Sequence, residues 1–267
     1  MSDLLWYQYL LIGLVFSWSG FVRSGLGFGG AVLALPFMLL IHNEPLVFLP
    51  IIAIHLLIFS LWITYGPQFK EFVGLNRPSA NKSPSAANEP TIDWPYLKKA
   101  LAIMIIPKLV GVLGLLTLPA NLMSGIIFAI VFVYAIGYTL NKPFKSNHPA
   151  LDIIFLMLGG YVSGTSLIGA PLIVAVFATR VAKHQLRDTL FVLWFILVCI
   201  KMATFIAAGV DLQLIHQLWL LPCATLGHLI GMRFHQHMVE AETPLFYRVL
   251  GIVLIIISLF GLWNALT

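Results

Sequence analysis

The sequence predicts an all-α integral membrane protein made of two inverted repeats, and three observations lead to this fold class. The composition is 60% hydrophobic and only 9% charged, whereas about a quarter of the residues of a soluble domain are charged. The mean hydropathy is +0.97, and the apolar residues gather in stretches long enough to cross a bilayer. Two further apolar stretches are broken by glycines and resemble each other. We expect one transmembrane domain over 1–267.

Six apolar stretches are long enough for single membrane-spanning helices, which need roughly 20 residues to cross a hydrocarbon core of about 30 Å. They run over residues 45–66, 96–118, 121–141, 189–209, 214–234 and 245–265. The segment 67–95 is rich in Asn, Ser, Pro and charge, which predicts a solvated loop. No basic n-region precedes the first apolar stretch, so we expect that stretch to be retained and not removed as a signal peptide.

Two other apolar stretches, 4–41 and 151–179, are interrupted by SGLGFGG and SGTSLIGAP. We interpret each as two helical arms joined at a glycine break. Ser24 matches Ser163 and Gly30 matches Gly169 without a gap, and three spans follow each break. The chain therefore divides into a first repeat over 1–146 and a second repeat over 147–267.

The basic residues predict how the chain crosses the membrane. Apart from three inside apolar stretches, they lie in four segments: 70–99, 142–145, 180–187 and 233–248. The alternate connections and both termini contain no Lys or Arg, so the positive-inside rule predicts cytoplasmic basic segments, the 67–95 loop included, and periplasmic termini. This holds only if each broken stretch is a hairpin that starts and ends on one side. A hairpin plus three spans inverts the second repeat, an architecture that recurs in transporters.

Lys108 and Lys201 are the strongest candidates for a binding site. Each lies near the middle of a predicted span, where a cation costs at least about 2.5–3.5 kcal/mol on insertion scales. All ten Asp and Glu residues lie in loops or at helix ends. The pair therefore predicts an electropositive site for a small anionic substrate. The structural alternative is that both lysines bind backbone carbonyls at the broken helices. Arg23 either lies near the midplane and binds substrate, or lies at a turn as a topology signal.

The glycine breaks are the second part of the predicted substrate site. Glycines let the backbone approach a ligand closely, and the N-terminus of the helical arm after each break favours an oxyanion. The residues are Ser24, Gly27, Gly29 and Gly30 in the first break, and Ser163, Gly164, Thr165, Ser166 and Gly169 in the second. The alternative is that these glycines only permit close helix packing.

His55 and His228 lie inside predicted spans, and imidazole is the side chain that changes charge most readily near neutral pH. They are candidates for proton coupling, although a hydrogen bond to a neighbouring helix is the more common role. Cys199 and Cys223 lack metal-ligand spacing and indicate small core residues. We predict no metal, no cofactor and no nucleic-acid partner; a homo-oligomer is compatible with the sequence.

The motifs GFVRSGLGFGGAVLALP, GGYVSGTSLIGAP, PKLVGVLG, IKMATFIAAG and PCATLGHLIG resemble those of the TauE/SafE sulfite exporter family. This resemblance implies a permease that moves sulfite or an organosulfur anion across a bacterial inner membrane, and no enzyme. Two other function classes stay open from the residues. Ser163 or Ser166 with His228 as a base would form an intramembrane serine hydrolase, and the same helices would form an anion channel.

Overall fold

In the computed structural model every regular element of the described residues is a helix, which confirms the predicted all-α class. It describes residues 1, 4–26, 30–72, 91–142, 144–240 and 244–267, with side chains except at 24–26, 30–33, 62–72, 234–240 and 244–247. In chain order the helices are α1 (Trp6–Leu26), α2 (Gly30–Ile41), α3 (Pro45–Phe72), α4 (Trp94–Thr117), α5 (Ala120–Thr139), α6 (Pro149–Ser166), α7 (Ala170–Arg180), α8 (Lys183–Ala207), α9 (Leu214–Glu240) and α10 (Pro244–Leu266).

The six predicted spans correspond to α3, α4, α5, α8, α9 and α10. Five helices, all but α3, are long and apolar enough over their described residues to cross a membrane. Helix α8 begins at Lys183, six residues before the predicted start of the span. The polar residues before that span are also helical. Hydropathy locates the part of a helix that suits lipid, so it does not predict where the helix itself begins.

Helix α4 shows the inside-out polarity expected of a helix in lipid. Ile106, Val110 and Leu113 on its outer face are exposed, whereas Lys108 and Gly111 on its inner face are buried. Exposed leucine, isoleucine and valine side chains also lie on α5, α6, α9 and α10. Such a large apolar exterior is rare in soluble monomers and identifies the protein as multi-pass in the membrane.

Each broken stretch folds as a hairpin whose two ends lie together. In the first, Gln8 Nε2 near the start of α1 donates to the carbonyl of Ile41 at the end of α2, at 2.9 Å. In the second, Arg180 Nε at the end of α7 lies 2.7 Å from Asp152 Oδ2 in the first turn of α6. Because α7 has 11 residues, it extends about 16 Å. It is therefore too short to cross a hydrocarbon core of about 30 Å by itself.

Contacts between loops and helix ends show which connections lie together at each end of the helices. At one end, Asn43 Nδ2 after α2 donates to Asn121 Oδ1 at the start of α5, at 2.7 Å. The rings of Tyr9 and Trp219, near the starts of α1 and α9, lie 6.0 Å apart at this end. At the opposite end, the backbone N–H of Asp93 before α4 donates to Thr189 Oγ1 in α8, at 3.0 Å. The N-terminus thus lies at the end opposite the Arg180–Asp152 ion pair, and so does the C-terminus, because Ala265 of α10 lies beside Gly125 of α5.

The side of the membrane that each end faces stays a prediction, and cysteine labelling tests it. Single cysteines at Asn43, Ala120 and Leu212 are expected to react with an impermeant maleimide from the periplasm, because these positions lie at the end without basic residues. A cysteine at the exposed Lys183 is expected to be protected until the membrane is permeabilised, whereas Ser146, also predicted to be cytoplasmic, is buried and would not react in either case. Labelling of Lys183→Cys in intact cells would contradict the predicted orientation.

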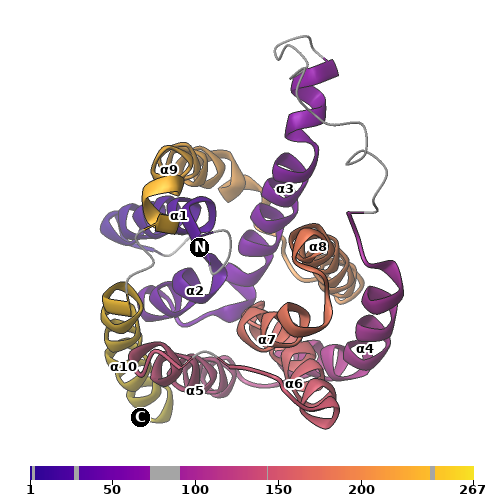
Figure 1. Cartoon of the computed structure of the whole chain (residues 1–267). Helices are drawn as coiled ribbons and strands as arrows, with labels where there is room; N and C mark the ends of the chain where they lie inside the picture. Colours follow the sequence, from indigo (N-terminus) through magenta and orange to yellow (C-terminus); the bar gives the residue numbers. More distant parts are fainter. Residues whose placement is uncertain (2–3, 27–29, 73–90, 143, 241–243) are drawn as a thin grey trace.

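Two helix pairs cross through the same glycine contact. In the α4–α6 pair, a Cβ on Gly111 would clash with the Tyr161 carbonyl, and a Cβ on Gly164 with the Lys108 carbonyl. In the α9–α1 pair, Gly227 meets the Ser17 carbonyl and Gly20 meets the Ala224 carbonyl in the same way. In all four helices the carbonyl that is met belongs to the residue three positions before that helix's glycine. Figure 1 shows α1 beside α9 and α6 beside α4.

The repeated crossing changes the register between the two halves. It equates Gly164 of α6 with Gly20 of α1, whereas the ungapped sequence match equates Gly164 with Gly25. The ungapped match of the glycine breaks therefore does not give the structural alignment of α1 with α6. The first hairpin has extra residues between its glycine crossing and the start of α2. The recurrence supports a duplication, and the inversion of the repeats stays a prediction.

Candidate functional site

The last turn of α6 forms the tip of the second hairpin. Leu167, which caps α6, adopts a left-handed conformation with φ 62°. This conformation costs a non-glycine residue about 1–2 kcal/mol, and it ends the helix, so the last carbonyls have no partners one turn further on. Gly169 is the N-cap of α7, and a Cβ there would clash with the Gly159 carbonyl and press on Ser163. The start of α7 thus lies directly against the last turn of α6.

Lys201 reaches this turn from α8. Its ammonium donates to the carbonyl of Gly164 at 2.7 Å and to that of Thr165 at 3.3 Å. It also lies 5.5 Å from the centre of the Phe205 ring, one turn further along α8. Phe205 was not among the predicted site residues, although residues four apart on a helix are neighbours. Lys201 therefore caps the negative end of the α6 dipole, which is the contact that the structural alternative expects.

Lys108 reaches the same turn from α4. Its ammonium donates to Ser163 Oγ at 3.1 Å, and its side chain is fully buried, with 0% exposed. An ammonium can donate three hydrogen bonds, and among the described residues the only partner of this one is the neutral Ser163 hydroxyl. Unlike Lys201, Lys108 does not satisfy a helix end. Its part in substrate binding stays a prediction.

The two amino groups bind adjacent residues of one helix turn, Ser163 and Gly164. Lys201 is also 0% exposed. The only ion pair among the described residues is Arg180 with Asp152, and it lies at the other end of the second hairpin. Two ammonium groups buried at one turn repel each other, and among the described residues neither lysine pairs with a carboxylate.

The hydroxyl groups of Thr165 and Ser166 turn back on their own helix. Both donate to the Val162 carbonyl, at 3.1 and 3.0 Å respectively. Gly164 lies at the α4–α6 crossing, in the packing role of the alternative interpretation. Their role in binding stays a prediction, whereas Ser163 holds Lys108 directly.

The remaining cationic candidate lies in the first half of the chain. Arg23 in the last turn of α1 donates to the His55 carbonyl at 3.4 Å, and its guanidinium lies 5.2 Å from the centre of the Phe59 ring. The His228 ring lies 5.2 Å from Phe59, centroid to centroid. Arg23, His55 and His228 thus form a second polar cluster, between α1, α3 and α9. The contacts of Arg23 are with this cluster and not with the Lys108–Lys201 pair.

The structure does not describe the side-chain contacts of the four predicted site residues in the first glycine break. Gly27 and Gly29 lie outside the described residues. Ser24 is described only by its backbone in α1, and Gly30 begins α2. Their predicted part in the site stays untested.

A protein-family model described as sulfite exporter TauE/SafE matches residues 79–261. The match contains α4 to α9 and most of α10, and so both lysines and the whole second hairpin. The motif of the first hairpin lies before the matched residues and stays a resemblance. No match was found among curated proteins, and none among solved structures. Because the match covers more than half of the chain, the protein belongs to the sulfite exporter TauE/SafE family.

Proposed function

We propose that this protein is a secondary transporter for a small anion, sulfite or an organosulfur anion, in the bacterial inner membrane. The single observation that carries the proposal is a pair of fully buried lysines, Lys108 from α4 and Lys201 from α8, whose ammonium groups contact the same turn of α6. A buried cation without a counter-ion is expensive. An anion at this turn offsets that cost, so the site favours an anionic ligand.

The contacts suggest separate roles for the two lysines. Lys201 holds the end of α6 in place and supplies positive charge through a fixed position. Lys108 exchanges the Ser163 hydroxyl for an oxygen of the anion, and the first turn of α7 adds its positive helix end beside Ser163. We place the hairpin tip inside the bilayer, because substrate sites near the midplane are expected in a transporter made of inverted repeats.

We also propose that protons are the coupling ion, with His55 and His228 as carriers. Both are buried between α1, α3 and α9, in contact with Phe59 and close to Arg23. A proton that arrives in this cluster adds charge next to Arg23, which favours rearrangement of the first hairpin. The cluster and the lysine pair would then serve the two halves of one cycle.

The hydrolase interpretation finds no support in the geometry. Ser163 lies in the α4–α6 pair and accepts a hydrogen bond from Lys108. His228 lies in α9, where its backbone faces Gly20 of α1. The nucleophile and the base thus belong to different helix pairs, and we propose no enzymatic activity.

Flux measurements on the purified protein in proteoliposomes test the proposed function. Sulfite, sulfate, thiosulfate, alkyl sulfonates and carboxylates are compared with and without a pH gradient. We expect saturable flux of at least one sulfur oxyanion, because a carrier saturates and a channel does not. The same anion at 100 times its dissociation constant stabilises the fold by about 2.7 kcal/mol. Absence of flux and of stabilisation for every anion would contradict the proposal.

A further inference from the structure

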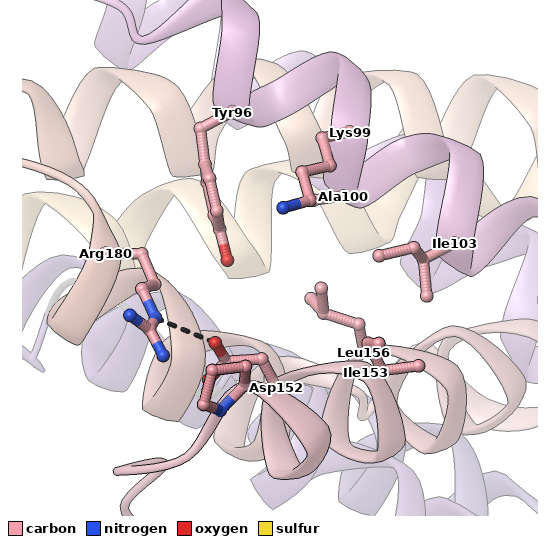
Figure 2. Close-up of a pocket in the computed structure, with 9 residues that line it drawn as sticks. Tyr96, Lys99, Ala100, Ile103, Asp152, Ile153, Leu156 and Arg180 are labelled. Carbon is pink, nitrogen blue, oxygen red and sulfur yellow. Dashed lines mark hydrogen bonds and ion pairs between the residues drawn. The ribbon is translucent and has the colours of Figure 1, made fainter.

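A pocket of about 250 Å³ lies away from the lysine pair, where the starts of α4 and α6 meet the end of α7. Its lining combines charged and polar groups with apolar side chains: Tyr96, Lys99, Ala100, Ile103, Pro149, Asp152, Ile153, Leu156 and Arg180. Figure 2 shows Tyr96 and Lys99 on one side of the space and the Arg180–Asp152 ion pair on the other. The pocket thus has one charged end and one apolar end.

The charged end carries more positive than negative charge. Lys99 and Arg180 provide two cations, and Asp152 provides one carboxylate. The Asp152 carboxylate is already engaged, since it receives a hydrogen bond from Ser146 Oγ at 2.5 Å and pairs with Arg180 Nε at 2.7 Å. Among the described residues the ion pair engages Arg180 through Nε, so the two terminal nitrogens of the guanidinium can bind an anion. This end is therefore suited to a phosphate group.

The apolar end continues onto the outer surface of the helices. Ile103, Ile153 and Leu156 line the pocket. Ile153 is exposed, as are Leu151 and Ile154 on α6. The outer face of α4 above Ile103 is apolar too, as Ile106 shows. A ligand held at the charged end can therefore extend an acyl chain along this face without leaving the protein surface.

The position of the pocket agrees with the headgroup layer of a bilayer. It lies at the starts of two helices and the end of a third, and Trp94 and Tyr96 at the start of α4 are the aromatic residues typical of a membrane interface. It also lies at the end that carries the basic segments, which the positive-inside rule places in the cytoplasm, where anionic lipids are concentrated. Basic pockets between transmembrane helices on this side bind anionic headgroups.

We propose that this pocket binds the headgroup of an anionic phospholipid, with its phosphate between Lys99 and Arg180 and its acyl chains along α4 and α6. The volume accommodates a phosphate with its glycerol and not a whole lipid, since pockets for complete small ligands span about 300–1,000 Å³. The bound lipid would hold together the two ends of the second hairpin, because Arg180 and Asp152 close that hairpin. This site does not depend on which anion the protein transports.

Lipid titration of the delipidated full-length protein, followed by native mass spectrometry, tests the proposal. Dioleoylphosphatidylglycerol is compared with dioleoylphosphatidylcholine, which has the same chains and no net charge, and with soluble glycerol 3-phosphate. Lys99→Gln removes a lining cation, and Lys98→Gln is the matched control, because Lys98 is the exposed neighbour outside the pocket. We expect tighter binding of phosphatidylglycerol, about tenfold weaker binding in Lys99→Gln, and less than a twofold change in Lys98→Gln.

Three outcomes would overturn the proposal. Equal binding of the two lipids would mean that the pocket does not select charge. Equal losses in Lys99→Gln and Lys98→Gln would mean that the basic surface attracts anionic lipids without a defined site. Binding of glycerol 3-phosphate as tight as that of the lipid, with the same dependence on Lys99, would assign the pocket to a soluble phosphate compound.

Discussion

Gly111→Ala is expected to destabilise the folded protein by about 1–3 kcal/mol, the usual cost of inserting a methyl group into a well-packed core. The new Cβ would clash with the Tyr161 carbonyl and lie 3.1 Å from the Thr165 amide nitrogen. Both are backbone atoms, so the clash is relieved only if α4 and α6 move apart. Such a movement also separates Lys108 from Ser163, so we expect transport to fall together with stability.

Gly114→Ala in the same helix is the matched control. The atoms nearest to its Cβ would be side-chain carbons at 3.8 and 3.9 Å, which is ordinary van der Waals contact. Alanine favours a helix over glycine by up to about 1 kcal/mol, so this variant is expected to be as stable as the parent protein or more so. Thermal unfolding in detergent measures both. Equal stability of the two variants would contradict the close crossing of α4 and α6.

The helices and the burial of the lysines follow from local sequence, and the contacts at the site do not. Hydropathy and length locate α4, α5, α8, α9 and α10, because lipid selects apolar residues over a fixed thickness. A lysine in such a stretch must face the protein interior, and Lys108 and Lys201 do. That both reach a single turn of α6 depends on how α4 and α8 cross it. Helix crossings are set by packing between segments far apart in the chain.

The different roles of the two lysines also lie beyond the sequence. Both were predicted as one class of mid-span cation, with backbone carbonyls as the alternative partner. In the fold, Lys201 has those carbonyls and Lys108 has a hydroxyl instead. The position where α6 ends decides this difference, and a leucine in a left-handed conformation ends it. Leucine is not a residue that signals such an ending, as glycine or asparagine would.

The largest functional effect is expected for Lys108→Met. Methionine keeps the length of the side chain and removes the charge, so the site loses attraction for an anion. A hydrogen bond to a charged group contributes about 1.5–3 kcal/mol, and we expect the initial rate at low substrate concentration to fall at least tenfold. Stability is expected to stay the same or rise, since an expensive buried charge is removed. Ile106→Met, on the exposed outer face of the same helix, controls for the introduced methionine.

Lys201→Met is expected to lose transport and stability together. The carbonyls of Gly164 and Thr165 lose their donor, and an unsatisfied buried polar group costs about 1–3 kcal/mol. This contrast separates the two roles. A stable Lys201→Met would show that the helix end does not need its cap, and a destabilised Lys108→Met would show that Lys108 also has a structural role.

The flux of sulfite, or of whichever anion the parent protein carries, through Lys108→Met in proteoliposomes tests the central claim most directly. The protein is reconstituted at equal amounts beside Ile106→Met, after both variants are shown to unfold at or above the temperature of the parent protein. We expect parent-like flux for Ile106→Met and a loss of at least tenfold for Lys108→Met. Parent-like flux through stable Lys108→Met would contradict the assignment of this buried lysine to an anion site.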